Sequence, residues 1–338
     1  MPEHRPGSIE RILDAAANRA REGLRVVEDY VRFVLADEEL SRRARDTRHR
    51  VTELAKLCVP GLALLKERDT PGDLGADPET FRTPNRASAL TVVLCAFKRA
   101  QEALRSLGEF SRLTVASVGG GFESLRYEVY ELEKASLAAA LPRVLLERAT
   151  VALITTLASA DARLPQLDDA LPLARTGCHV LVVRAGNLND LAFLEAARQL
   201  RSVCDETETL LFIAARADVA RLAGADGVLV GETGLPVPVA RQAMPQTALV
   251  AYAAQSVYEA NLAALDGADA VFLEASGKHR WDEFVEWTED PLSPCFATGF
   301  TSVDEALARE ELRRVAFGAS TVDADQVRRA VEALATRG

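Results

Sequence analysis

The sequence predicts two domains of different class: a helical bundle, followed by an α/β domain of the (β/α)8 or TIM-barrel type. Three observations predict this. Apolar residues recur at three- and four-residue steps through residues 8–141, which is helical periodicity. Part of that region repeats itself. From residue 150 onward, eight short apolar runs alternate with helix-length segments. We therefore assign residues 1–142 to the helical domain and residues 146–338 to the barrel.

The composition is typical of a soluble globular protein, because 48% of the 338 residues are hydrophobic and 27% are charged. The net charge of −10 argues against binding to nucleic acid or to an anionic membrane surface. The five cysteines form no CxxC pair, so neither a disulfide framework nor a zinc site is indicated. The N-terminus is short and polar, and no apolar stretch approaches membrane-spanning length, which together predict a cytoplasmic protein.

The first helix is predicted to begin at Ser8, and its apolar residues keep helical spacing as far as Val34. Further helices are expected at about 38–58, 85–115 and 122–140, with a Pro- and Gly-containing loop at 68–75. The glycine-rich run at 117–122 lacks the Lys-Ser/Thr pair of a phosphate-binding P-loop, so we expect a flexible connection between helices there.

The helical region contains an internal repeat. Ala17–Phe33 aligns without a gap with Phe97–Leu113, and 47–49 weakly resembles 125–127. A duplicated helix pair forms a bundle with a pseudo-two-fold axis. The repeated helices carry a set of polar residues at recurring positions, which we call the polar stripe: Asn18, Arg19, Glu22, Arg25, Arg99, Glu102 and Arg105.

Two interpretations of this polar stripe stay open. Residues three apart on a helix lie within reach of each other, so the stripe is either a solvated ladder of ion pairs or a phosphate-binding or domain-pairing surface. The recurrence of the polar residue types, and not only of the apolar ones, favours the second interpretation.

The eight predicted strands are nearly continuous in apolar residues, which is typical of strands buried on both faces. They are Thr150–Thr156, His179–Ala185, Thr209–Ala215, Gly227–Gly231, Ala248–Ala254, Ala270–Ala275, Cys295–Gly299 and Arg314–Ser320. His179 begins a strand, so we expect it at the face opposite the active site.

Such barrels carry their chemistry at the carboxyl ends of the strands. The candidate catalytic residues there are Arg184, Glu232, Glu274 and Lys278. Backbone N–H groups after strands seven and eight bind phosphate in barrels of this type. The candidate phosphate-binding residues are Gly299, Phe300, Gly318, Ala319 and Ser320.

Both halves resemble known families. Residues 8–141, through Asn18-Arg19, Glu22-Gly23-Leu24-Arg25 and Lys98–Arg105, resemble the helical domain fused in front of thiamine phosphate synthases. That resemblance implies a role in phosphorylating hydroxymethylpyrimidine phosphate. Ala16, Ala96 and Gly108 depart from the family pattern, which favours Asn, Asn and an acidic residue at those positions.

The barrel resembles thiamine phosphate synthase and its relative, the thiazole tautomerase, best over Arg216–Val237 and again at Gly267-Ala268-Asp269. The resemblance implies a transferase that joins hydroxymethylpyrimidine diphosphate to thiazole phosphate with Mg2+ and releases pyrophosphate. The positions that match the family's leaving-group and metal residues carry no such groups, apart from Arg184. They are Val182, Gly186, Ala214, Ala215 and Gly234.

Three hypotheses about function follow. The barrel is a working synthase that takes Mg2+ ligands from other positions, such as Glu232 and Glu274; or activity resides only in the helical kinase-like domain; or the protein is a non-catalytic phosphate-binding or scaffolding relative. The expected ligand is a phosphorylated pyrimidine or thiazole, with no nucleic acid or membrane partner and with a homodimer left open. Mg2+ is expected only if the barrel is catalytic, and its ligands are not identified by the sequence.

Overall fold

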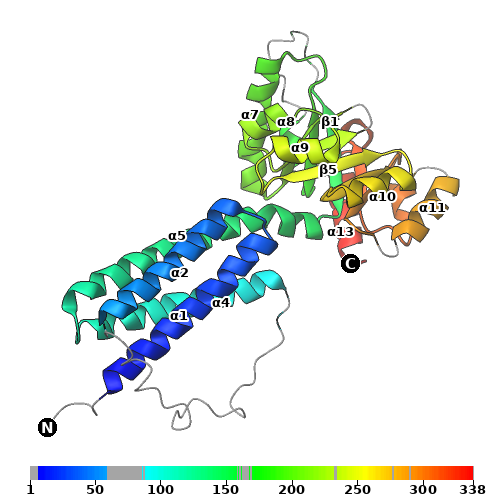
Figure 1. Ribbon diagram of the computed structural model, residues 1–338. Helices are drawn as coiled ribbons and strands as arrows, with labels where there is room; N and C mark the ends of the chain where they lie inside the picture. The colour runs from blue at the N-terminus through cyan, green and yellow to red at the C-terminus, as the bar shows by residue number, and fades with distance from the viewer. Residues whose placement is uncertain are drawn as a thin grey trace. The chain divides into compact units, whose positions relative to one another are not determined.

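The computed structural model confirms a helical region followed by an eight-stranded parallel barrel (Figure 1). It describes residues 7–58, 86, 88–157, 159, 161, 167, 170–231, 234–275, 278–288 and 291–337, with only the backbone at 278–279. The chain divides into two compact units, Met1–Ala140 and Leu141–Gly338. The expected loop at 68–75 lies outside the described residues.

The helical unit is built from α1 (Ser8–Phe33), α2 (Glu38–Cys58), α4 (Ala89–Ser111) and α5 (Gly119–Arg148). Their apolar residues form one buried core that includes Leu24, Leu104, Phe97 and Phe122. In Figure 1, α1 and α2 are blue and α4 is cyan. The pattern of apolar residues at helical spacing therefore predicted these helices correctly, although the bounds of α4 and α5 differ by several residues from those expected.

The sequence led us to expect a flexible connection at the glycine-rich run, 117–122, and this expectation was wrong. Ser117 and Val118 lie in a 3-10 turn, η2 (Ala116–Val118), and Gly119 begins α5. A Cβ at Gly119 would lie 2.9 Å from the Arg112 side chain, and one at Gly121 would lie 3.0 Å from Leu54. At Gly119 and Gly121, neighbouring side chains occupy the space of a Cβ, whereas the Cβ position of Gly120 is open.

Helices α1 and α4 approach each other closely through small residues. A Cβ at Gly23 would lie 2.8 Å from the backbone oxygen of Ala96 and 3.3 Å from the Cβ of Ala100. Ala20 and Ala100 are fully buried at this contact. The backbones can come this close only because Gly23 has no side chain.

Glu28 is a buried carboxylate at the contact between α1 and α2, with only 2% of its surface exposed. Arg45 and Arg48 each donate a hydrogen bond to it at 3.1 Å, and Arg25 lies 3.8 Å away. Burial raises the pKa of Glu28, but the hydrogen bonds from Arg45 and Arg48 outweigh it and lower the pKa below its ordinary value. The three guanidinium groups thus keep the carboxylate charged inside the bundle.

The second half of the repeat holds its carboxylate on the other helix. Glu28 corresponds to Gly108 in the alignment of α1 with α4, and Arg45 corresponds to Glu123 when 47–49 is aligned with 125–127. The Glu123 carboxylate lies 3.9 Å from where a Gly108 Cβ would be and forms an ion pair with Arg126. The first half thus carries its carboxylate on the first helix of the pair, α1, and the second half carries it on the second helix, α5, while the partner arginines Arg48 and Arg126 occupy equivalent positions.

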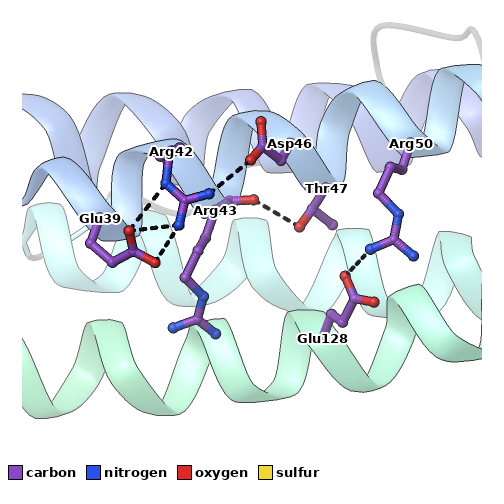
Figure 2. Close-up of polar contacts among 7 residues, drawn as sticks. All are labelled: Glu39, Arg42, Arg43, Asp46, Thr47, Arg50 and Glu128. Atoms are coloured by element: carbon purple, nitrogen blue, oxygen red, sulfur yellow. Dashed lines mark hydrogen bonds and ion pairs between the residues drawn. The ribbon is translucent and has the colours of Figure 1, made fainter.

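Figure 2 shows a further set of polar contacts on α2. Arg42 bridges Glu39 and Asp46 along the helix, and Arg50 reaches Glu128 on α5. Arg50 and Glu128 are themselves equivalent positions when 47–49 is aligned with 125–127. Contact between equivalent residues is what a pseudo-two-fold axis between α2 and α5 requires.

The second unit is a closed parallel barrel in which each strand pairs with its neighbours in chain order. The strands are β1 (Val151–Thr156), β2 (Val180–Arg184), β3 (Leu210–Ala214), β4 (Gly227–Gly231), β5 (Leu249–Ala254), β6 (Ala270–Glu274), β7 (Cys295–Thr298) and β8 (Val315–Gly318). The helices are α6 (Leu171–Ala174), α7 (Asp190–Thr207), α8 (Ala217–Ala223), α9 (Val237–Ala243), α10 (Val257–Leu265), α11 (Lys278–Thr288), α12 (Val303–Leu307) and α13 (Ala324–Ala335), with a 3-10 turn η3 (Ala319–Thr321).

Inward-facing side chains fill the barrel. Phe272 and Phe296 stack inside it with ring centroids 4.9 Å apart. A Cβ at Gly227 would lie 2.4 Å from the ring of Phe212, so the glycine makes room for that ring. Leu146, near the end of α5, joins the same interior cluster. The interior is thus a packed core below a mouth formed by the carboxyl ends of the strands.

Two Gly-Ala-Asp triplets, Gly224-Ala225-Asp226 and Gly267-Ala268-Asp269, stabilise the amino-terminal end of the barrel, opposite the mouth. Asp226 accepts a hydrogen bond from a backbone N–H of β3, and Asp269 accepts one from β5, each at 2.8 Å. Arg201 and Arg241 form ion pairs with these carboxylates. His179 lies at the same end, where its Nδ1 is 3.4 Å from a backbone nitrogen at the start of β1. Among the described residues, no helix is both long and apolar enough to cross a bilayer.

We predict that Gly23→Ala destabilises the helical unit by about 1–3 kcal/mol, because the added methyl group meets the Ala96 carbonyl. In a solvated helix the same change stabilises by about 1 kcal/mol, so the sign is diagnostic. The measurement is urea unfolding followed by circular dichroism. Gly120→Ala is the matched control, since nothing lies within 4 Å of its Cβ position. Equal effects of the two substitutions would contradict the close approach.

We also predict that Glu28→Gln destabilises the helical unit by about 2–4 kcal/mol at pH 7, because three arginines lose their buried counter-charge. The folded-state pKa of Glu28 is lowered from 4.5, so its contribution is complete above that value and is lost as the pH falls through the folded-state pKa. The difference between wild type and variant should therefore shrink as the pH falls below 4.5.

The readout for this comparison is the unfolding transition by circular dichroism at each pH. Both tryptophans, Trp281 and Trp287, lie in the barrel, so the transition followed by their fluorescence serves as the internal control. A difference between wild type and variant that does not change with pH would count against the charged state of Glu28.

Candidate functional site

The mouth of the barrel contains one cavity of about 560 Å³. It brings together seven of the residues that the sequence singled out for this domain. They are Arg184, Glu274, Gly299, Phe300, Gly318, Ala319 and Ser320. The strands place them there because each residue ends a strand or directly follows one, and all eight strands end at the same rim.

Arg184 and Glu274 supply the opposite charges of the mouth. Arg184 ends β2 and Glu274 ends β6, so the two residues lie four strands apart on opposite sides of an eight-stranded barrel. The Arg184 side chain is exposed to the cavity. Glu274 is partly buried and has Arg280 at 4.0 Å. The mouth therefore offers a guanidinium on one side and a compensated carboxylate on the other.

The segments after β7 and β8 line the mouth with backbone. Gly299 has a φ of 92°, a left-handed conformation that glycine adopts without strain, and it leads into the buried ring of Phe300. Phe300 packs edge-on against Trp281, with ring centroids 6.1 Å apart. The turn η3 follows β8 directly, and the first N–H groups of such a turn have no partner within it. These segments are suited to an oxyanion.

Two of the four candidate catalytic residues cannot be assessed. Glu232 lies outside the described residues, and of Lys278 only the backbone, at the start of α11, is described. At the end of β3, Ala215 has a φ of 59°, a conformation in which Asn and Asp are enriched. The backbone there thus keeps a shape suited to those residues, although its side chain is only a methyl group.

Reasoning from the sequence missed several polar residues of the same cavity. Thr155 and Thr156 end β1, and Gln255 directly follows β5. The signal that could have found them is the rule already applied to the charged residues, namely a polar side chain at the carboxyl end of a predicted strand.

The described residues of the mouth do not fit an Mg2+ site held by the protein. Such sites use one or two carboxylates with free lone pairs, and the described mouth has only Glu274, beside a guanidinium. In the part of the chain that the structure describes, no group of three or more His, Cys, Asp and Glu side chains could hold a metal ion.

The helical unit has a cavity of its own, of about 610 Å³, between α1 and α4. Its lining follows the internal repeat. Ala16, Arg19, Glu22, Gly23 and Val26 from α1 are matched by Ala96, Arg99, Glu102, Ala103 and Ser106 from α4, and Val92 completes the lining. We call this the α1–α4 cavity.

The structure divides the polar stripe that the sequence treated as one surface. Arg25 and Arg105 do not line the cavity; they form ion pairs with Asp29 and Glu109, at 3.3 and 2.9 Å. Asn18 is likewise outside it and accepts a hydrogen bond from Arg21. A step of three residues falls short of a full helical turn, so a run of such steps moves around the helix and leaves the cavity.

Comparison with known proteins gives one family match in the helical region and another in the barrel. The model of the ThiD2 family matches residues 11–135, and the model described as thiamine monophosphate synthase matches residues 151–276.

Several relatives are named thiamine-phosphate synthase. The one from Rhodopirellula baltica is 36% identical over 265 residues, which cover 76% of this chain and 68% of that protein. The one from Nostoc punctiforme is 34% identical over 263 residues, covering 78% and 72%. The one from Synechocystis sp. is 32% identical over 313 residues, covering 88% and 87%.

Proposed function

The chain belongs to the thiamine-phosphate synthase family, and from that premise we propose that its barrel binds a phosphorylated thiazole or pyrimidine of thiamine biosynthesis. The observation that carries the proposal is the single mouth cavity, which holds Arg184 together with the backbone segments after β7 and β8. Its volume of about 560 Å³ falls in the usual range for small-molecule sites.

The phosphate is bound by the backbone of Gly299 and of Gly318–Ser320, with Arg184 supplying a positive charge. Guanidinium groups and oriented N–H groups are the usual ligands of a phosphate ester. The heterocyclic ring lies over Phe272 and Leu229, which form the apolar floor of the cavity. Thr156, Thr298 and Gln255 are then available to hydrogen-bond the polar edge of the ring.

The transfer reaction itself is slow or lost in this barrel. Family resemblance implies that pyrophosphate leaves from residues that match Val182, Gly186, Ala214, Ala215 and Gly234 here, and none of those five side chains offers an oxygen or a nitrogen. In a synthase, bound Mg2+ supplies positive charge to the departing pyrophosphate. The described part of the mouth contributes one carboxylate, Glu274, so we propose substrate binding for the barrel and derive no step through Mg2+.

We expect such a protein to work in the cytoplasm on free metabolites, without nucleic acid or a membrane as partner. The net charge of −10 supports this, because neither polyanion would be attracted to the surface as a whole.

We predict that Arg184→Ala weakens binding of thiazole phosphate to the full-length protein by about 5- to 100-fold, the scale of one charge-assisted hydrogen bond of about 1–3 kcal/mol. The measurement is isothermal titration calorimetry with thiazole phosphate, hydroxymethylpyrimidine phosphate and hydroxymethylpyrimidine diphosphate, each with and without Mg2+. Arg221→Ala, an exposed arginine of α8 outside the cavity, is the matched control.

Three results would decide between the hypotheses. Binding that Arg184→Ala weakens and that Mg2+ leaves unchanged supports the proposal. Affinity for the diphosphate that rises sharply with Mg2+, together with turnover, would mean that residues outside the described mouth rebuild a synthase site. Equal affinities of wild type and Arg184→Ala would remove the mouth as the binding site.

A further inference from the structure

We propose that a further cavity of the helical unit, between the end of α1 and the start of α2, binds inorganic phosphate. Its volume is about 420 Å³, and its lining residues differ from those of the barrel mouth and of the α1–α4 cavity. They are Arg32, Ala36, Asp37, Glu38, Ser41, Arg42 and Arg45, and we call this site the α1–α2 cavity. The site does not depend on the function proposed for the barrel.

Arg32 brings an uncompensated positive charge to the α1–α2 cavity. In the part of the chain that the structure describes, it makes no hydrogen bond or ion pair, and its guanidinium lies over the Phe33 ring, 4.8 Å from the centroid. Arg42 and Arg45 also line the cavity, but each is paired with a carboxylate, at 2.7 and 3.1 Å (Figure 2 shows the contacts of Arg42). Arg32 is therefore the guanidinium that an incoming anion can pair with.

Ser41 brings a hydroxyl that lacks a partner. It lies in the first turn of α2 and lines the cavity, with only 7% of its surface exposed. Its side chain makes no hydrogen bond to any described residue, whereas the hydroxyl of Thr47 on the same helix donates to the carbonyl of Arg43 at 2.8 Å (Figure 2). A buried hydroxyl without a partner costs free energy, so Ser41 is suited to donate to an anion in the cavity.

The start of α2 supplies backbone donors to the same place. The helix is 21 residues long and begins at Glu38, which lines the cavity. The first N–H groups of a helix have no partner within it, and its amino end carries a partial positive charge. Asp37 accepts a hydrogen bond from one of them, the N–H of Leu40, at 2.8 Å. The N–H groups before it, the hydroxyl and the guanidinium are donors of the kinds that bind phosphate in proteins.

The lining also defines the class of ligand. Among the described residues that line the cavity, Ala36 alone is apolar, so there is no surface for a heterocyclic ring. Of the two acids, Asp37 is engaged as the cap of α2, and Glu38 is exposed. The described residues contain no group of three or more acids, histidines and cysteines that could hold a metal ion, which argues against a cation. A small inorganic oxyanion fits these donors.

The second half of the repeat fills the equivalent place with a side chain. Arg32 aligns with Arg112, and Ser41 aligns with Gly119 when the second helices of the two halves are aligned as above. The Arg112 side chain lies 2.9 Å from where a Gly119 Cβ would be, and it pairs with an acid of its own helix at 3.6 Å. Because Ser41 has a Cβ, Arg32 cannot lie over α2 in the same way. Serine in place of glycine therefore leaves a cavity and a free arginine in the first half.

The bound anion has a structural effect. In the second half, the Arg112 side chain connects the end of α4 to the start of α5. Phosphate held by Arg32, Ser41 and the first N–H groups of α2 makes the corresponding connection in the first half. A ligand that binds only the folded state raises the free energy of unfolding. Inorganic phosphate is therefore a stabilising effector of the helical unit.

The test is calorimetric titration of the full-length protein with inorganic phosphate, against chloride at the same ionic strength. Every sample carries Arg184→Ala, so that phosphate binding at the barrel mouth is impaired. We expect Arg32→Ala to weaken phosphate binding by about 5- to 100-fold, and Ser41→Ala by about 3- to 10-fold. Arg112→Ala is the matched control, because it removes the equivalent arginine outside the cavity, and its affinity should stay within about two-fold of the parent.

Glu38→Gln separates an anion site from a cation site. The substitution removes a negative charge beside the bound phosphate, so we expect it to strengthen binding. General damage to the cavity would weaken binding instead. Weaker phosphate binding by Glu38→Gln would therefore count against the proposal.

Unfolding gives a second readout. The urea midpoint followed by circular dichroism should rise with phosphate in the parent and should not rise in Arg32→Ala. The transition followed by tryptophan fluorescence reports the barrel and should stay unchanged in both. Equal phosphate affinities of the parent and Arg32→Ala would overturn the site, and so would a loss of affinity in Arg112→Ala as large as that in Arg32→Ala. No phosphate binding beyond that of chloride would overturn it as well.

Discussion

Both units depend on a glycine at a position where a neighbouring group occupies the space of a side chain. At Gly23 the α1 backbone comes so close to α4 that a methyl group would meet the Ala96 carbonyl. At Gly227 the missing side chain leaves room for the Phe212 ring inside the barrel. The first contact sets the depth of the α1–α4 cavity, and the second lets the barrel interior pack tightly beneath its mouth.

The sequence predicted the architecture well because both kinds of element carry a strong periodic signal. The eight apolar runs correspond to the eight strands: strands buried on both faces are continuous in apolar residues, and runs this short that alternate with helix-length segments favour strands. The glycine-rich run at 117–122 was wrongly expected to be a connection. A Cβ at Gly119 would meet Arg112 and one at Gly121 would meet Leu54, which lies on another helix, and no local pattern reveals such contacts.

The sequence placed residues at the barrel mouth where topology alone decides position, and their roles stay predictions. The residues at the ends of β2, β6, β7 and β8 line one cavity because a closed parallel barrel brings all strand ends together. In the helical unit, the repeat located Arg19 and Arg99 correctly but did not separate them from Arg25 and Arg105. That separation depends on which arginine finds an acid one turn along its helix, and it depends on rotamers as well as on spacing. Ala16 and Ala96, two of the three departures from the family pattern in the helical domain, are equivalent residues that line the cavity.

The different placement of the acid in the two halves, as Glu28 on α1 and as Glu123 on α5, has a consequence for how this protein can evolve. Exchange of helices between the two halves would bring like charges together. A copy of α5 in place of α2 would set the counterpart of Glu123 against Glu28, while a copy of α2 in place of α5 would gather arginines around Gly108 with no acid between them. Each helix is now bound to its own partner by charge. The two halves therefore keep similar sequences, but a helix of one half cannot replace its counterpart in the other half without placing like charges together.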